Sequence, residues 1–226
     1  MEHVLDNPVW NALISGNLSL ADGNGEIRFF TKDVSPFVGL KSNSSLNFRH
    51  LHDSVTHQDP VILISNQKIN IPDVWNVLYC IEGFQMVYEQ LELSNKATIA
   101  IIPLQKKHVP QMLALTKLTN PGPFAERTID FGHYYGVFEE KELVAMAGQR
   151  LHVFGYAEIS AVCTHPDHLG KGYARQLLKY QIQRIQATSG IPFLHVRSDN
   201  ERAIKVYESL GFSTRTNVYF YVLKKA

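Results

Sequence analysis

A turn in which two glycines flank a lysine, Gly170–Lys171–Gly172, carries the clearest chemical signal, because a helical stretch with further basic residues follows it. Amides at a strand-to-helix junction bind phosphate well, since glycines allow a close approach and the positive end of the helix faces the anion. Lys171 and Arg175 would add charge beside it. The turn therefore suits a phosphate or diphosphate. The same residues are also compatible with a plain tight turn whose basic side chains are solvated.

Two other phosphate motifs do not fit this turn. A P-loop requires serine or threonine directly after the lysine, and Gly172 stands there. A dinucleotide fingerprint requires a third glycine or alanine, where this chain has Arg175. It also requires a parallel opening, whereas antiparallel strands are expected before the turn. A nucleotide-binding enzyme is therefore the weaker alternative.

The elements that must position the turn are readable from about residue 96 onward. Apolar runs and breaks predict a strand, a helix, an antiparallel meander of three strands, a helix, a strand, a helix and a last strand. The glycine turn lies between the meander and the second helix. The expected ranges are 97–104, 109–119, 133–139, 143–153, 156–165, 174–185, 193–198, 200–212 and 218–224.

The first 95 residues have a less regular pattern and no recognisable chemical motif. Their apolar runs predict a strand over 60–65, a short helix over 72–81 and another strand over 84–93. This part has 5 basic and 11 acidic residues, whereas residues 96–226 have 17 basic and 10 acidic ones. The basic bias agrees with an anionic ligand, although a solvated basic surface also produces it.

The composition of the 226-residue chain, with 45% hydrophobic residues, indicates one large or two small folded domains. A net charge of +1 gives no reason to expect nucleic acid as a partner. The two cysteines and the start of the chain, which has no signal-peptide pattern, predict a cytoplasmic protein. No apolar run is long enough for a membrane, and His50, His52 and His57 lack the spacing of a metal site, so neither is expected.

Five segments together resemble the GNAT superfamily of CoA-dependent N-acyltransferases, and most closely the branch that includes the C-terminal domain of glycine N-acyltransferases. They are TNPGPF, YYGVF, LVAMAGQRL, EISAVCTHP and NERAIKVYESLGF, in the order expected of the family. The resemblance implies an α/β (α+β) fold in which residues 96–226 form a mixed, mostly antiparallel sheet with flanking helices. Residues 1–95 would be a smaller α/β part, a diverged half of this fold that walls the acceptor site.

The resemblance places acetyl-CoA, or another short acyl-CoA, on the glycine turn. The family pattern (Gln/Arg)-x-x-Gly-x-(Gly/Ala) falls on residues 167–172, with Asp167 where glutamine or arginine is usual and Leu169 where arginine is common. The resemblance assigns the pyrophosphate to Leu169, Gly170, Lys171, Gly172, Tyr173, Ala174 and Arg175.

The same resemblance assigns the pantetheine arm to the strand before the turn, at Val162, Cys163 and Thr164. Asn200 matches a position that hydrogen-bonds the cofactor, and Ala203 would be small because the arm passes close by. Cys163 also allows a route in which a thiolate takes the acyl group first. By strand alternation it lies on the face opposite Glu158, so a buried, inert cysteine is the preferred interpretation.

Two residues match the catalytic positions of the family. Glu158 matches a glutamate base, which an amine needs in order to lose a proton before it attacks, and burial would raise the pKa of this carboxyl. Pairing of Glu158 with Arg150 or Arg197 is the structural alternative. Tyr207 matches a tyrosine that protonates the departing thiolate, although it could also be a core aromatic residue. The amide of Val162 would stabilise the oxyanion.

We therefore predict a CoA-dependent N-acyltransferase, most simply an N-acetyltransferase, that acts on the primary amine of a small molecule or peptide by direct attack. A non-catalytic acyl-CoA-binding module is the alternative, and the departures at Asp167 and Leu169 leave room for it. Acceptor specificity is expected in the ranges 110–130 and 151–156 and in the N-terminal part. The last strand, VYFYV, would suit the edge of a homodimer if it were exposed.

Overall fold

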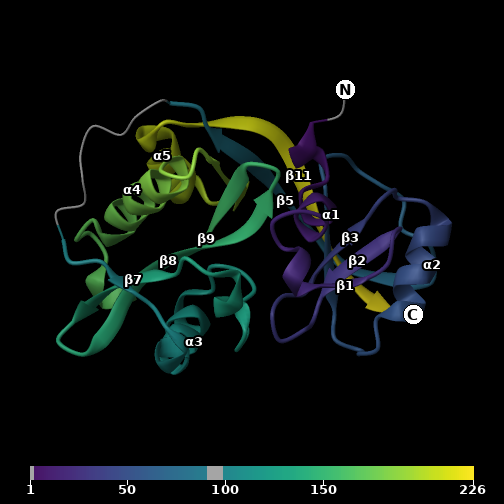
Figure 1. The fold of residues 1–226 in the computed structure, drawn as a ribbon, viewed down its shortest axis with the longest axis horizontal. Coiled ribbons are helices and arrows are strands. Elements are labelled where there is room, and N and C mark those ends of the chain that lie inside the picture. Colours follow the sequence, from purple (N-terminus) through teal and green to yellow (C-terminus); the bar gives the residue numbers. More distant parts are fainter. Residues whose placement is uncertain (1–2, 91–98) are drawn as a thin grey trace.

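The computed structural model describes residues 3–90 and 99–226, and the strands in these ranges form one sheet (Figure 1). The strands are β1 (Ala21–Gly23), β2 (Ile27–Phe30), β3 (Phe37–Leu40), β4 (Val61–Ser65), β5 (Trp75–Tyr88), β6 (Ile102–Pro103), β7 (Tyr135–Glu139), β8 (Glu142–Val153), β9 (Tyr156–Thr164), β10 (Ile191–Arg197) and β11 (Phe212–Lys225). Their order in the sheet is β1-β2-β3-β4-β11-β5-β10-β9-β8-β7-β6. The pairs β3–β4 and β9–β10 are parallel and the others antiparallel. The expected mixed, mostly antiparallel sheet is confirmed.

Helices flank the sheet on both faces (Figure 1). On one face lie α4 (Tyr173–Gln186) and α5 (Glu201–Leu210), and on the opposite face lies α3 (Val109–Thr119). In the N-terminal part, α1 (Pro8–Leu13) packs against β3 and β8, and α2 (Ser45–Ser54) packs against β2 and β3. No helix of the described residues is long and apolar enough to span a membrane.

The order of elements expected for the second part is confirmed. It is β6, α3, β7, β8, β9, α4, β10, α5 and β11. The meander β7–β8–β9 is antiparallel, and α4 crosses over between the parallel strands β9 and β10. The strand expected over 97–104 is shorter, since β6 covers Ile102–Pro103; residues 97 and 98 lie outside the described ranges.

The helix expected over 72–81 is wrong, because β5 already begins at Trp75. This strand pairs with β11 over its whole length, from Trp75 opposite Lys225 to Tyr88 opposite Phe212. A short apolar run suits a helix or a buried strand equally well, and here a partner far along the chain decided between them. The separate strand expected over 84–93 is part of β5 as far as Tyr88, and residues 91–93 lie outside the described ranges.

The last strand does not meet the condition under which it would suit a dimer edge, because it is not an exposed edge of the sheet. β11 lies between β4 and β5, so both of its edges are paired, and it offers no free edge to a second copy. β5 comes from the N-terminal part but lies between β10 and β11 of the second part. The predicted boundary between residues 95 and 96 falls outside the described residues.

Close backbone contacts hold α1 between two distant parts of the sheet. A Cβ atom on Gly39 of β3 would lie 2.6 Å from the Cα atom of Trp10. Beyond the helix, the N–H of Gly16 donates to the carbonyl oxygen of His152 in β8 at 3.2 Å. The N-terminal segment is therefore fixed against β3 on one side and against β8 on the other.

Replacing Gly39 by alanine should lower the free energy of unfolding by about 1–3 kcal/mol, because the methyl group has no room beside α1. Urea denaturation followed by tryptophan fluorescence measures this difference. Gly25→Ala is the matched control, since a Cβ atom at Gly25 would meet nothing within 4 Å. Equal stability of the two variants would contradict the close contact.

Candidate active site

The candidate site is the region where β9 and β10 separate. The two strands pair only between Tyr156–Glu158 and Ile191–Phe193. Beyond Glu158, β9 continues to Thr164, whereas β10 pairs with β5 on its other side. One edge of β9 therefore has no strand partner among the described residues, and its peptide groups are available to a ligand.

A β-bulge at Ala161 lies in this unpaired part of β9. Ser160 lies opposite Gly148 and Cys163 lies opposite Met146, so β9 has one extra residue there. Ala161 has a φ of +53°, in the left-handed region. A bulge of this kind changes which face the following side chains point to.

The bulge overturns the orientation expected for Cys163. Its side chain packs in the apolar cluster on the α3 side, which also contains Phe37, the ring beneath Arg150. Glu158 pairs with Arg150 and so lies on this face as well, whereas Val162 packs toward α4 and α5. The thiol is buried, which raises the pKa of Cys163 to about 11.

The backbone of β9 alternates in direction after the bulge. The N–H of His165 donates to the carbonyl oxygen of Val144 in β8 at 2.7 Å. The peptide groups of Cys163, two residues earlier, point toward β8 in the same way. The peptide groups of Val162 and Thr164 therefore point to the free edge on the other side of β9. The hydroxyl oxygen of Thr164 is buried and has no hydrogen-bond partner among the described residues. Two of the three residues predicted along the pantetheine arm thus direct their peptide groups to the free edge, and their contact with a cofactor stays a prediction.

The glycine turn leads into α4 as predicted. Gly170 has a φ of +82° and Gly172 a φ of +80°, a region that favours glycine. No side chain caps α4, which begins at Tyr173. A Cβ atom on either glycine would meet nothing within 4 Å, so backbone conformation requires these glycines and packing does not. Within the part of the chain that the structure describes, the first amides of α4 and the positive end of the helix therefore face open space.

The two basic side chains of the turn already have protein partners. Nζ of Lys171 lies 3.4 Å from a carboxylate oxygen of Glu139, and Arg175 donates to the hydroxyl of Ser209 at 2.8 Å. These contacts are exposed, so each is weak and exchangeable. Leu169, where the family often has arginine, is 49% exposed and adds no charge.

α5 brings further predicted residues to the same region. Ala203 and Tyr207 pack against the apolar cluster that Val162 also contacts. The hydroxyl of Tyr207 has no hydrogen-bond partner within the described ranges, and burial raises the pKa of Tyr207 to about 12, so it keeps its proton at neutral pH. Asn200 has a structural task that was not expected, because its side-chain oxygen accepts from the N–H of Ala203 at 3.2 Å and caps the helix.

Glu158 occupies the last paired position before the strands separate. It is 0% exposed. Arg150 donates to its two carboxylate oxygens at 2.6 and 2.9 Å, and Nδ1 of His195 lies 2.8 Å from one of them. The structural alternative, pairing with Arg150, is confirmed, while Arg197 pairs with Asp199 instead.

The expected rise in the pKa of Glu158 is wrong. Burial acts to raise this pKa, but the charge of Arg150 and the hydrogen bonds from Arg150 and His195 lower it more strongly. The pKa of Glu158 therefore lies well below its usual range. An enclosed carboxylate that accepts three hydrogen bonds is a poor proton acceptor for an amine.

The contact at Glu158 continues through buried polar side chains into β5 and β11. Gln85 lies 3.0 Å from Nε2 of His195 and donates to the carbonyl oxygen of Leu5 at 3.0 Å. Its side-chain oxygen accepts from Arg215, which also donates to Asp6 at 2.6 Å. Because Gln85 turns its N–H to His195, the histidine accepts at Nε2 and carries its proton on Nδ1, toward the carboxylate.

His195, Gln85 and Arg215 were not among the residues predicted from the sequence. The signal that could have identified His195 and Gln85 is a polar residue inside an apolar run, as in FLHVRS and FQMVYEQ. His195 and Gln85 lie directly opposite each other in β10 and β5, and this register is what brings them into contact.

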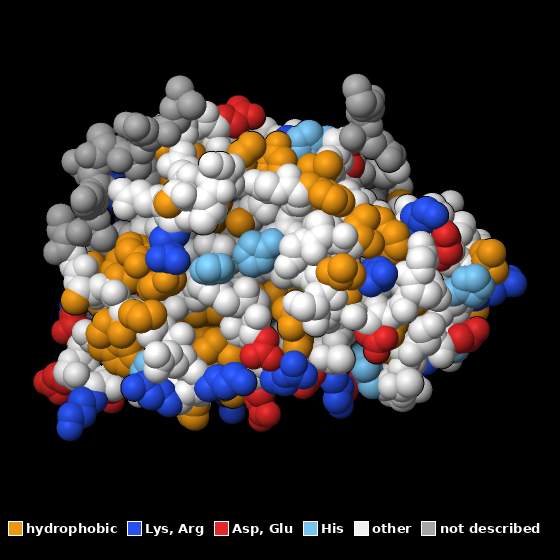
Figure 2. Space-filling model, in the orientation of Figure 1, with side chains coloured by type: hydrophobic (Ala, Val, Ile, Leu, Met, Phe, Trp, Pro, Cys, Tyr) orange, Lys and Arg blue, Asp and Glu red, His pale blue; other side chains and the backbone are white. Residues whose placement is uncertain are grey.

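Histidine side chains are exposed near the centre of the face shown in Figure 2. The rings of His133 and His152 contact each other edge-on, with 5.9 Å between their centroids. Across residues 3–90 and 99–226, no group of three or more His, Cys, Asp and Glu side chains is placed to hold a metal ion. That the reaction needs no metal stays a prediction.

The chain is similar to known acetyltransferases. A solved structure described as a putative acetyltransferase from the GNAT family, from Novosphingobium aromaticivorans, is 31% identical, covers 100% of both chains and has a TM-score of 0.91. The profile of the FR47-like protein family matches residues 134–221. That range contains the free edge of β9, the glycine turn and α5.

Two curated relatives match shorter stretches. The N-alpha-acetyltransferase RimI of Mycobacterium tuberculosis is 34% identical over 84 residues, which are 35% of this chain and 51% of the relative. The mycothiol acetyltransferase of Streptomyces avermitilis is 27% identical over 130 residues, 56% of this chain and 42% of the relative. The matched stretches thus span about half the length of these curated relatives.

Glu158→Gln should lower the free energy of unfolding by about 3–5 kcal/mol at pH 7, because Arg150 stays buried without a charge partner. Urea denaturation of both proteins measures this difference. A lowered folded-state pKa stabilises the fold above the unfolded-state value, so the difference should shrink as the pH falls below 4.5. Glu201→Gln, on an exposed part of α5, is the control and should change little. A difference that grows in acid would contradict this account.

Proposed function

The chain belongs to the GNAT family of acetyltransferases, and on this premise we propose that it is a CoA-dependent N-acyltransferase that moves an acetyl or another short acyl group to a primary amine. The observation that carries the proposal is the gathering of Val162, Tyr207 and the uncapped start of α4 around the free edge of β9. The N–H groups of β9 and α4 and the hydroxyl of Tyr207 are hydrogen-bond donors for different parts of an acyl thioester, from its pyrophosphate to its sulfur.

The residues at this edge fit an acyl-CoA. The first amides of α4, with Lys171 and Arg175 beside them, would hold the pyrophosphate. The peptide groups of Val162 and Thr164 would pair with the pantetheine amides, as a neighbouring strand would. The unpartnered hydroxyl of Thr164 supports this placement, because a buried hydroxyl without a hydrogen bond is costly unless a ligand supplies one.

In the proposed reaction, the amine nitrogen bonds to the thioester carbonyl carbon and the carbon–sulfur bond breaks. The N–H of Val162 would stabilise the negative charge that develops on the carbonyl oxygen. Tyr207, which its raised pKa keeps protonated, would donate its hydroxyl hydrogen to the leaving sulfur; the same rise makes it a weaker acid than an exposed tyrosine. The proton lost by the amine would pass through water and restore the tyrosine hydroxyl, which balances the reaction.

We assign Glu158 a positioning role in place of the base role expected from its position in the family. A base would have to release both Arg150 and His195 before it could accept a proton. Held as it is, the carboxylate fixes β9 against β8 and β10 where the free edge begins. A covalent route through Cys163 is also disfavoured, because the raised pKa keeps this buried thiol protonated.

The acceptor is proposed as the primary amine of a small molecule or a peptide. One curated relative is named for mycothiol and the other for an N-alpha position, so both kinds of acceptor have a precedent among similar proteins. The closer resemblance to the C-terminal domain of glycine N-acyltransferases is part of the same proposal, and the five sequence segments support it.

Gly172→Val should weaken acetyl-CoA binding at least about tenfold, because a β-branched residue distorts the start of α4 when forced to a positive φ. Isothermal titration calorimetry measures the affinity. Gly132→Val is the matched control, since Gly132 has a φ of +85° and open space around it and lies outside both the glycine turn and the expected acceptor ranges. Similar affinity losses in both variants, or in neither, would contradict the cofactor assignment.

Tyr207→Phe should lower kcat about 100-fold and leave the KM for acetyl-CoA unchanged, because the hydroxyl acts on the leaving sulfur and not on binding. Release of CoA thiol with a panel of small amines and short peptides measures both constants. Tyr79→Phe, on the exposed part of β5, is the control. An unchanged kcat would overturn the role of Tyr207, and acetyl-CoA binding without turnover of any amine would favour the non-catalytic module.

A further inference from the structure

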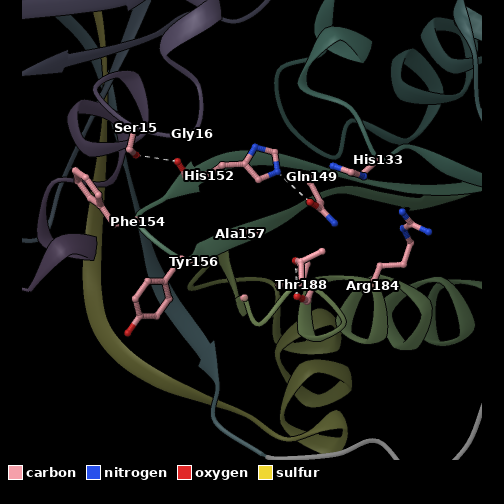
Figure 3. A pocket seen from close by; sticks show the side chains of 13 residues that line it. Ser15, Gly16, His133, Gln149, His152, Phe154, Tyr156, Ala157, Arg184 and Thr188 are labelled. Atoms are coloured by element: carbon pink, nitrogen blue, oxygen red, sulfur yellow. Dashed lines mark hydrogen bonds between the residues drawn. The ribbon is translucent and has the colours of Figure 1, made fainter.

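A pocket lies at the end of α4 opposite the glycine turn (Figure 3). Its volume is about 300 Å³, and it is lined by α4, the end of β8, the turn between β8 and β9, the start of β9, and Gly16. α4 has 14 residues, so its two ends are about 20 Å apart. The pocket, which includes part of the range 151–156 expected to carry acceptor specificity, is therefore separate from the free edge of β9 beyond Glu158, where acyl-CoA is proposed to bind.

The floor of this pocket consists of polar side chains that bond to one another. Gln181 is 0% exposed and donates to the carbonyl oxygens of His133 and Ala147 at 2.7 and 3.1 Å. Its own side-chain oxygen accepts from Gln149 at 3.0 Å, and Gln149 in turn lies 2.9 Å from Nε2 of His152 (Figure 3). A paired buried network is rigid, so the pocket is preformed.

Backbone strain is concentrated around the pocket. His133, Phe154 and Ser189 have φ values of +57°, +40° and +59°. A positive φ is unusual for a bulky residue and strains the backbone. In a two-residue turn such as Phe154–Gly155, the pair Asn–Gly would adopt the same backbone conformation with less strain. The Phe154 side chain is 54% exposed, so core packing does not explain its presence. Strain of this kind is typical of ligand-binding sites.

Arg184 sets the charge of the pocket. No aspartate or glutamate is among its lining residues. The guanidinium lies over the rings of Tyr135 and Tyr180 and has no hydrogen bond or ion pair with any described residue. Burial and the charge of Arg184 lower the pKa of His133, and burial lowers that of His152, so both imidazoles are neutral at pH 7. Arg184 is exposed, so it is a solvated cation of the pocket, and it has no anionic partner among the described residues.

We propose that this pocket binds a small aromatic carboxylate, at a second site that does not take part in acyl transfer. Arg184 stands at one end of the pocket and would pair with the carboxylate. Phe154 stands at the other end with its ring turned outward (Figure 3), so the ligand ring would lie beside the Phe154–Gly155 turn. The volume suits a ligand of this size. Because the site is built from the far end of α4, the proposal stands or falls independently of the acyltransferase activity.

Calorimetric titration of the full chain with indole-3-acetate and with its neutral analogue indole-3-acetamide tests this proposal. The acid is expected to bind at least about tenfold more tightly, because Arg184 can form a bidentate ion pair with the carboxylate and only a hydrogen bond to a neutral carbonyl oxygen with the amide. Arg184→Gln should abolish this preference, whereas Arg202→Gln, which removes an exposed arginine of α5, should preserve it. Saturating acetyl-CoA should not displace the acid.

Phe154→Asn provides a second, independent readout. The variant should melt at a higher temperature, because Asn–Gly relieves the strained turn, and it should bind the acid and the amide more weakly by the same factor. Failure of the acid to bind, equal affinity for acid and amide, a preference that survives Arg184→Gln, or displacement by acetyl-CoA would each overturn the proposal.

Discussion

Glu158 holds three strands together at the level where the sheet opens, because its carboxylate accepts hydrogen bonds from Arg150 of β8 and His195 of β10. Separating these partners would leave a charge buried without compensation, at a cost of several kcal/mol. β9 and β10 therefore cannot drift apart here, and they part immediately beyond this residue. The free edge thus begins at a rigid point of the protein and needs no ligand to define it.

The N-terminal part makes this buried contact possible by keeping water away from it. Phe37 of β3 lies against the guanidinium of Arg150, with 4.4 Å between the guanidinium carbon and the ring centroid. Asp6 pairs with Arg215 at the other end of the same network. Charges interact more strongly when water is excluded, so residues without a recognisable motif complete the electrostatics of the catalytic sheet.

The two ends of α4 offer anions two different kinds of surface. At its beginning, uncapped amides and left-handed glycines face solvent, so the backbone itself can hold a diphosphate. At its far end the helix dipole is unfavourable for an anion, and a side chain, Arg184, has to supply the charge. One helix can therefore serve two sites without either disturbing the backbone of the other.

Features that depend only on residues a few positions apart along the chain were determined by the sequence alone. The helical spacing of α4, the glycine turn and the order of elements in the second part are of this kind, and so is the family resemblance. Only the tertiary structure decided that 75–81 is a strand and that β11 lies inside the sheet, because each depends on a partner far along the chain. The extra residue at Ala161 moved Cys163 to the face of Glu158. The pKa of Glu158 fell instead of rising, because folding placed Arg150 and His195 beside it.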